Sequence, residues 1–155
     1  MSETHAGARI LVPLDGSHVV RAALGPAAEL AAAGDGELVL GIVVNPPFER
    51  AVADYVRNEH TTPETAATTY LHQVESDLLG ELDDVTIRQE VRTGDDPVAG
   101  ILDMADAVDA TMIAMTSHGY SGFKKLMLGS VTQEILHRSN VPVLLVPISE
   151  FPEDA

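Results

Sequence analysis

The sequence contains no cysteine and no tryptophan, and aromatic residues make up only 4% of its 155 residues. Without cysteine, the chain has no disulfide bond, no thiolate metal ligand and no cysteine nucleophile. No stretch approaches the roughly 18–20 consecutive apolar residues of a membrane-spanning helix. Residues 1–8 also lack the apolar and basic segments of a signal peptide. These absences predict a soluble, cytoplasmic protein.

Basic residues are scarce as well, because 9 Lys and Arg stand against 24 Asp and Glu, a formal net charge of −15. Lys124 and Lys125 are the only lysines. Nucleic acids and anionic membranes bind basic surfaces, so we expect neither as a partner. Two interpretations of the acidity stay open. The chain is an ordinary acidic protein, or it is adapted to the salt-rich cytoplasm of a halophile. At roughly 1 M salt, the interaction between surface charges is largely screened beyond about 3 Å.

Short apolar segments alternate with helical patterns along the chain. Apolar or alternating segments predict five strands, at Arg9–Leu14, Glu37–Val44 and residues 85–91, 111–115 and 141–146. Helical patterns at residues 18–33, 63–79, 97–108 and 130–138 lie between and after them. Residues 48–61 show no clear pattern and are treated as a loop.

Several residues mark where these helices begin or bend. Thr61 to Glu64 and Ser130 to Gln133 match capping boxes, and Gly-Asp-Asp-Pro at residues 94–97 predicts a helix start. Pro26 is expected to kink or split the first helix.

Strands joined by helical crossovers predict an α/β fold with a five-stranded parallel, Rossmann-like sheet in the order 3-2-1-4-5 and helices on both faces. We take residues 9–148 as one domain between tails at residues 1–8 and 149–155. Such sheets bind ligands at the carboxyl ends of the strands, where the strand order reverses. In this order the crevice lies between the first and fourth strands, which places Asp15 beside residues 116–119.

The most informative stretch runs from residue 116 to residue 131. It reads Thr-Ser-His-Gly, then nine residues, then Gly-Ser-Val. Gly119 permits positive φ or the close approach of a ligand, and a helix opening at Gly129-Ser130 presents free N–H groups to an anion. From these residues alone a simpler interpretation is equally good, in which Ser130 caps a helix and Gly119 turns a loop.

This stretch resembles the signature of universal stress proteins, which is Gly, two residues, Gly, nine residues, then Gly-Ser or Gly-Thr. Gly119, Gly129 and Ser130 match it, and Thr116 replaces the first glycine. The resemblance extends to Val-Pro-Leu-Asp-Gly-Ser at residues 12–17, to Gly-Asp-Asp-Pro at residues 94–97 and to Ser-Asn-Val-Pro-Val-Leu-Leu-Val-Pro at residues 139–147.

The resemblance implies a stress-response regulatory protein that binds ATP or another adenine nucleotide, together with Mg²⁺ or Mn²⁺. It implies that Asp15 contacts the ribose or a phosphate-bound metal, that Pro13 and Leu14 border the adenosine, that Val43 meets adenine through its backbone, that Met115 lines the base, and that Gly119, Gly129, Ser130 and Val131 hold phosphates. Thr116 either crowds the ribose or hydrogen-bonds to it.

The resemblance also implies a homodimer that pairs through residues 141–146 and an as yet unnamed protein partner. The sequence shows no P-loop, no G-x-S-x-G elbow, no H-x-x-x-H pair and no dedicated general base. We therefore expect no enzyme, and at most slow ATP hydrolysis. A ligand-free dimeric interaction module and a slow ATPase remain the alternatives.

Overall fold

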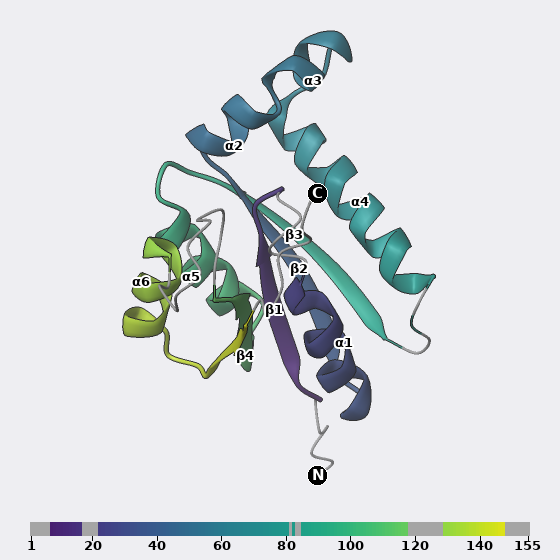
Figure 1. The fold of residues 1–155 in the computed structure, drawn as a ribbon, viewed down its shortest axis with the longest axis vertical. Helices are drawn as coiled ribbons and strands as arrows, with labels where there is room; N and C mark the ends of the chain where they lie inside the picture. Colours follow the sequence, from purple (N-terminus) through teal and green to yellow (C-terminus); the bar gives the residue numbers. More distant parts are fainter. Residues whose placement is uncertain (1–6, 17–21, 81, 83–84, 118–128, 148–155) are drawn as a thin grey trace.

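The computed structural model describes residues 7–16, 22–80, 82, 85–117 and 129–147, along which strands and helices alternate (Figure 1). The strands are β1 (Arg9–Leu14), β2 (Glu37–Val44), β3 (Thr86–Thr93), β4 (Met112–Thr116) and β5 (Val143–Val146). The helices are α1 (Leu24–Ala33), α2 (Pro46–Ala51), α3 (Ala53–Asn58), α4 (Pro63–Leu79), α5 (Pro97–Ala107) and α6 (Ser130–Arg138). None of the helices in these described ranges is long and apolar enough to cross a membrane.

The five strands form one parallel sheet in the order β3-β2-β1-β4-β5, which confirms the predicted order. β1 and β2 are largely buried on both faces, which explains why their sequences are nearly continuous apolar runs. After β1, the next two strands, β2 and β3, are added on one side of β1, and the last two, β4 and β5, are added on its other side. The strand order therefore reverses between β1 and β4.

Helices α1 and α4 cover one face of the sheet, and α5 and α6 cover the other (Figure 1). Successive residues of β1 point to opposite faces. Ile10, Val12 and Leu14 pack with α1 and α4, whereas Leu11 packs with α5 and α6. Each face thus has its own hydrophobic core, and a slip of one residue in the register would exchange the two.

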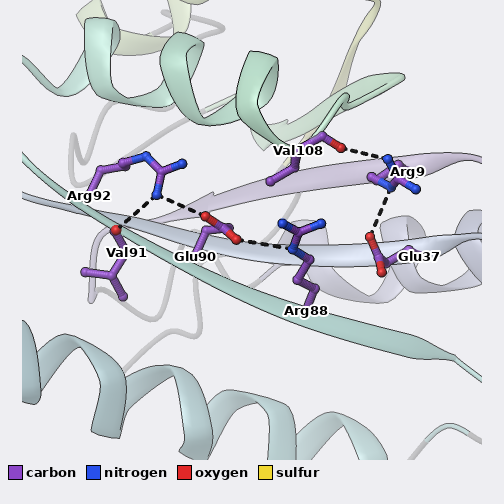
Figure 2. Close-up of polar contacts among 7 residues, drawn as sticks. All are labelled: Arg9, Glu37, Arg88, Glu90, Val91, Arg92 and Val108. Atoms are coloured by element: carbon purple, nitrogen blue, oxygen red, sulfur yellow. Dashed lines mark hydrogen bonds and ion pairs between the residues drawn. The ribbon is translucent and has the colours of Figure 1, made fainter.

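Polar contacts of Arg9 hold β1 in register at the amino-terminal edge of the sheet (Figure 2). Its Nε lies 3.0 Å from Glu37 Oε1 on β2, and its guanidinium donates to the Val108 carbonyl at 2.9 Å. Its backbone N–H donates to Thr111 Oγ1 at 2.9 Å, and its carbonyl accepts from the Thr111 N–H at 2.8 Å. One residue therefore ties β1 to β2, to the end of α5 and to the segment that enters β4.

The loop expected at residues 48–61 is wrong, because most of this segment is helical in α2 and α3. Asn45 caps α2, since its Oδ1 accepts from the Phe48 N–H at 2.9 Å. The prolines at the start of α2 occupy helix positions where a missing N–H costs no hydrogen bond. Phe48 is buried and joins the core of the α1–α4 face, which anchors the segment.

Both predicted capping boxes are wrong by one residue. Thr62 rather than Thr61 caps α4, because Pro63 takes the first helical position and the cap must precede it. The N-cap of α6 is Gly129, in an extended conformation, and Ser130 is already helical.

Three smaller expectations also change. Pro26 does not kink α1, because the helix begins at Leu24 and Pro26 lies in the first turn, where its missing N–H breaks no bond. β5 begins at Val143 rather than at residue 141, and β3 extends to Thr93.

The helix start predicted at residues 94–97 is confirmed, since α5 begins at Pro97. Asp96 caps it, with its carboxylate accepting from the Val98 and Ala99 N–H groups at 3.0 and 3.3 Å. We expect Asp96→Ala to lower the free energy of unfolding by about 1 kcal/mol, because two amides lose their partner. Urea unfolding measures this change. Asp95→Ala is the matched control, since Asp95 is exposed and carries the same charge outside the cap. Equal effects of the two substitutions would contradict the capping role.

Candidate functional site

The ladders on the two sides of β1 differ in length. β1 pairs with β2 from Arg9 to Leu14, whereas its ladder with β4 comprises only the pairs of Ile10 and Leu11. A cavity of ≈ 580 Å³ lies at the carboxyl ends of β1, β2 and β4. Its volume is in the range of small-molecule sites, and it lies where the strand order reverses.

The predicted site residues that the structure describes all line this cavity. They are Pro13, Leu14 and Asp15 at the end of β1, Val43 in β2, Met115 and Thr116 in β4, and Gly129, Ser130 and Val131 at the start of α6. The remaining predicted residue, Gly119, lies outside the described residues, as do His118, Lys124 and Lys125. Segments far apart in the sequence therefore meet at one cavity, as the predicted topology requires.

Sequence reasoning missed a second group of lining residues, which come from helices. Examples are Asn45 and Phe48 at α2, Tyr70 in α4, and Ile101 and Met104 in α5. The Asn-Pro-Pro run could have indicated a capped helix start beside the crevice. No sequence signal distinguishes Tyr70 or Ile101 from an ordinary core residue, because only the packing of α4 and α5 brings them to the cavity.

The start of α6 forms a polar wall of the cavity. The first N–H groups of a helix have no intrahelical acceptor, and the helix dipole adds partial positive charge there. Ser130, Val131 and Thr132 supply this first turn. A Cβ atom placed on Gly129 would meet no heavy atom of the described residues within 4 Å, so none of these residues fills the space beside it. This wall is suited to an anion.

Asp15 is the only charged side chain among the described residues that line the cavity. Within this described lining, an anion would therefore be held by neutral N–H and hydroxyl donors. The described part of the chain also contains no group of three or more His, Asp or Glu side chains that could hold a metal ion. A divalent ion at Asp15 would need further oxygen ligands from a bound molecule, such as phosphate groups.

Two glycines shape the apolar floor of the cavity. A Cβ atom on Gly41 would lie 2.2 Å from the Met104 Sδ, so the missing side chain gives the thioether its place. A Cβ atom on Gly100 would lie 2.8 Å from Val43 Cγ2, so α5 packs directly on the end of β2. Of these residues, Gly41, Val43 and Met104 line the cavity and make this part of its lining apolar, as is usual for a small-molecule site.

A family model described as the universal stress protein family matches residues 8–147, which include every described strand and helix. The chain belongs to the universal stress protein family. Universal stress proteins are generally not enzymes.

Individual universal stress proteins show the same relationship. The chain is 26% identical to the stress response protein NhaX of Bacillus subtilis over 160 residues, covering 89% of this chain and 96% of NhaX. The structure of MJ0577, a universal stress protein of Methanocaldococcus jannaschii, matches with a TM-score of 0.73 and 24% identity, over 93% of this chain and 98% of that chain. A universal stress protein in complex with cAMP matches with a TM-score of 0.66 and 22% identity, over 92% of this chain and 98% of that chain. These two structures show that the fold is shared.

Thr116 is where this chain departs from the universal stress protein signature. It is the last residue of β4, is buried, and pairs with Val146 of β5. Among the described residues other than glycine, positive φ occurs only at Asp35, His60 and Asp109, so Thr116 needs no left-handed backbone. A β-branched residue suits this strand conformation, and its hydroxyl-bearing side chain lines the cavity.

The floor of the cavity can be tested by Gly41→Ala. We expect it to lower the free energy of unfolding by about 1–3 kcal/mol, because the added methyl group displaces Met104 from a well-packed position. Gly25→Ala is the control, since a Cβ atom there meets nothing within 4 Å and α1 tolerates alanine. Urea unfolding compares the two. An unchanged stability for Gly41→Ala would show that Met104 does not depend on this glycine.

Proposed function

We propose that this cytoplasmic protein binds ATP or another adenine nucleotide in the cavity and acts as a stress-response regulator. Nucleotide occupancy would change the surface that it presents to a protein partner. The observation that carries the proposal is the composition of the cavity. Its lining includes the start of α6, an apolar floor, and Asp15 directly after the end of β1. Each part of the cavity suits one part of a nucleotide: the start of α6 suits the phosphates, the apolar floor suits the base, and Asp15 suits the ribose.

The end of β2 supports adenine as the base. The bonds from the Glu37 N–H to the Ala8 carbonyl and from the Gly94 N–H to the Val44 carbonyl fix the alternation along β2. By that alternation the peptide groups of Val43 point toward β1, which ends at Leu14 at this level. A backbone carbonyl accepts a hydrogen bond from the amino group of adenine and rejects the keto oxygen that guanine carries at the same place.

The start of α6 supports the placement of the phosphates. Free N–H groups at a helix start are a recurring anion site, and no described residue fills the space that a side chain at Gly129 would take. With the phosphates there, a bound Mg²⁺ or Mn²⁺ would join phosphate oxygens to the Asp15 carboxylate, since hard cations prefer oxygen ligands. The cAMP complex of a protein with the same fold also supports an adenine nucleotide as the ligand class.

Calorimetric titration with ATP and Mg²⁺, in low and molar KCl, tests this proposal. We expect saturable binding of one nucleotide per chain. We expect Gly129→Asp to weaken it by at least about 100-fold, because a buried like-charge contact costs several kcal/mol. The fold should survive, because φ is −63° at Gly129 and Asp is a favoured N-cap residue.

Gly25→Asp is the matched control, since it adds the same charge in open space away from the cavity. Equal ATP affinity in the wild type and both variants would place the phosphates elsewhere. A folded wild-type protein that binds no ATP in either buffer would favour the ligand-free interaction module.

We also propose that the protein forms a homodimer through residues 141–146, as the resemblance to the family implies. The two edges of the sheet differ in character. β3 carries Arg88, Glu90 and Arg92, joined by ion pairs of 3.2 and 3.0 Å (Figure 2), and charged side chains protect an edge from pairing. β5 is Val-Leu-Leu-Val, and all of its residues are partly exposed. The apolar edge is therefore the one suited to a second copy of the chain.

Leu145 offers a selective test of this interface. All four residues of β5 are partly exposed, but Val143, Leu144 and Val146 pack against the two core clusters of the described residues, whereas Leu145 belongs to neither. We expect Leu145→Asp to convert a dimer to a monomer in sedimentation velocity at micromolar concentration in molar KCl. Leu30→Asp on the exposed side of α1 is the control and should leave the dimer intact. A wild-type monomer, or a dimer that both variants retain, would exclude this interface.

A further inference from the structure

Pro13 occupies a special place on the edge of β1 that faces β4. The Ala8 carbonyl accepts from the Glu37 N–H on the β2 side, while the Arg9 carbonyl accepts from the Thr111 N–H on the β4 side. Since backbone groups alternate along a strand, Arg9, residue 11 and Pro13 all face β4. Proline has no N–H, so β1 cannot donate to β4 at this position.

The facing edge of β4 shows which acceptor loses its donor. The bonds from the Ile113 N–H to the Pro142 carbonyl and from the Ser117 N–H to the Val146 carbonyl point the odd-numbered residues of β4 toward β5. The even-numbered residues, including Ala114 and Thr116, therefore face β1. In the register that pairs Leu11 with Ile113, an N–H at position 13 would donate to the Ala114 carbonyl.

The ladder between β1 and β4 ends where this donor is missing. Its last pair is Leu11 with Ile113, two residues before Pro13. On the other edge, where Pro13 needs no N–H, β1 stays paired with β2 as far as Leu14. The interruption is thus confined to the β4 side of β1, where Pro13, Met115 and Thr116 line the cavity.

We propose that Pro13 is a positioning residue that holds the crevice between β1 and β4 open by withholding a backbone N–H. With an N–H at this position the ladder continues past Leu11 and draws Met115 and Thr116 toward the end of β1. The cavity then narrows between Asp15 and β4. The consequence for a nucleotide rests on the proposed function, whereas the extension of the ladder does not.

The test is Pro13→Ala, with Pro13→Val as a second variant whose side chain suits a strand. We expect the new amide at position 13 to be strongly protected from hydrogen exchange in the ligand-free protein, as an amide of a central ladder is. We expect ATP affinity to fall by roughly tenfold, the factor that corresponds to one net hydrogen bond that must break when the crevice opens. Pro63→Ala is the control, because it adds an N–H at the first position of α4, far from any ladder.

The outcomes separate this proposal from the proposed function. A new amide in both variants that exchanges as fast as an exposed amide would overturn the positioning role. A protected amide with unchanged ATP affinity would overturn its link to the ligand. If the wild-type protein binds no ATP, the proposed function fails, and the exchange rate at position 13 still decides whether Pro13 ends the ladder.

Discussion

The register of β1 is the constraint on which the rest of the structure depends. β1 lies between β2 and β4, is buried on both faces, and separates the two hydrophobic cores. Its first residue, Arg9, contacts Glu37 and Val108 (Figure 2) and also bonds to Thr111. With that end closed, the strands can separate only at the opposite end. The amino-terminal edge of the sheet therefore supplies rigidity, and the carboxyl edge supplies the cavity.

The sequence was sufficient for the sheet and for one half of the cavity. Strand order follows from apolar runs joined by helices, and that order alone brings Asp15, Thr116 and Gly129 together. The lining residues contributed by α2, α4 and α5 could not be predicted, for physical reasons. A Pro-Pro pair after a strand ends that strand and starts a helix equally well, so α2 was missed. Tyr70 lines the cavity because of how α4 packs, which no local pattern encodes.

An acidic protein that binds an anionic nucleotide faces an electrostatic conflict. The chain carries a formal net charge of −15, and the described lining of the cavity contains Asp15 and no cation. In the proposed site, backbone amides at the start of α6 would resolve this conflict locally, because they attract phosphate at short range without adding a charged side chain. Salt removes the long-range part, since charges are screened beyond about 3 Å at 1 M salt. The amide dipoles at short range and a salt-rich solvent at long range would thus both favour binding of an anion to this acidic protein.

The glycines of this chain differ in why a substitution would be harmful. Gly41 and Gly100 are surrounded by Met104 and Val43, so drift at either position damages the fold itself. Gly129 has an ordinary φ, and a Cβ atom there meets no heavy atom of the described residues within 4 Å, so other N-cap residues such as Ser or Asp suit this position. Under the proposed function, a lineage that no longer needed the ligand could therefore lose this glycine in a single codon change and keep a folded protein. Gain and loss of the proposed ligand within one fold would then be separated by one mutational step.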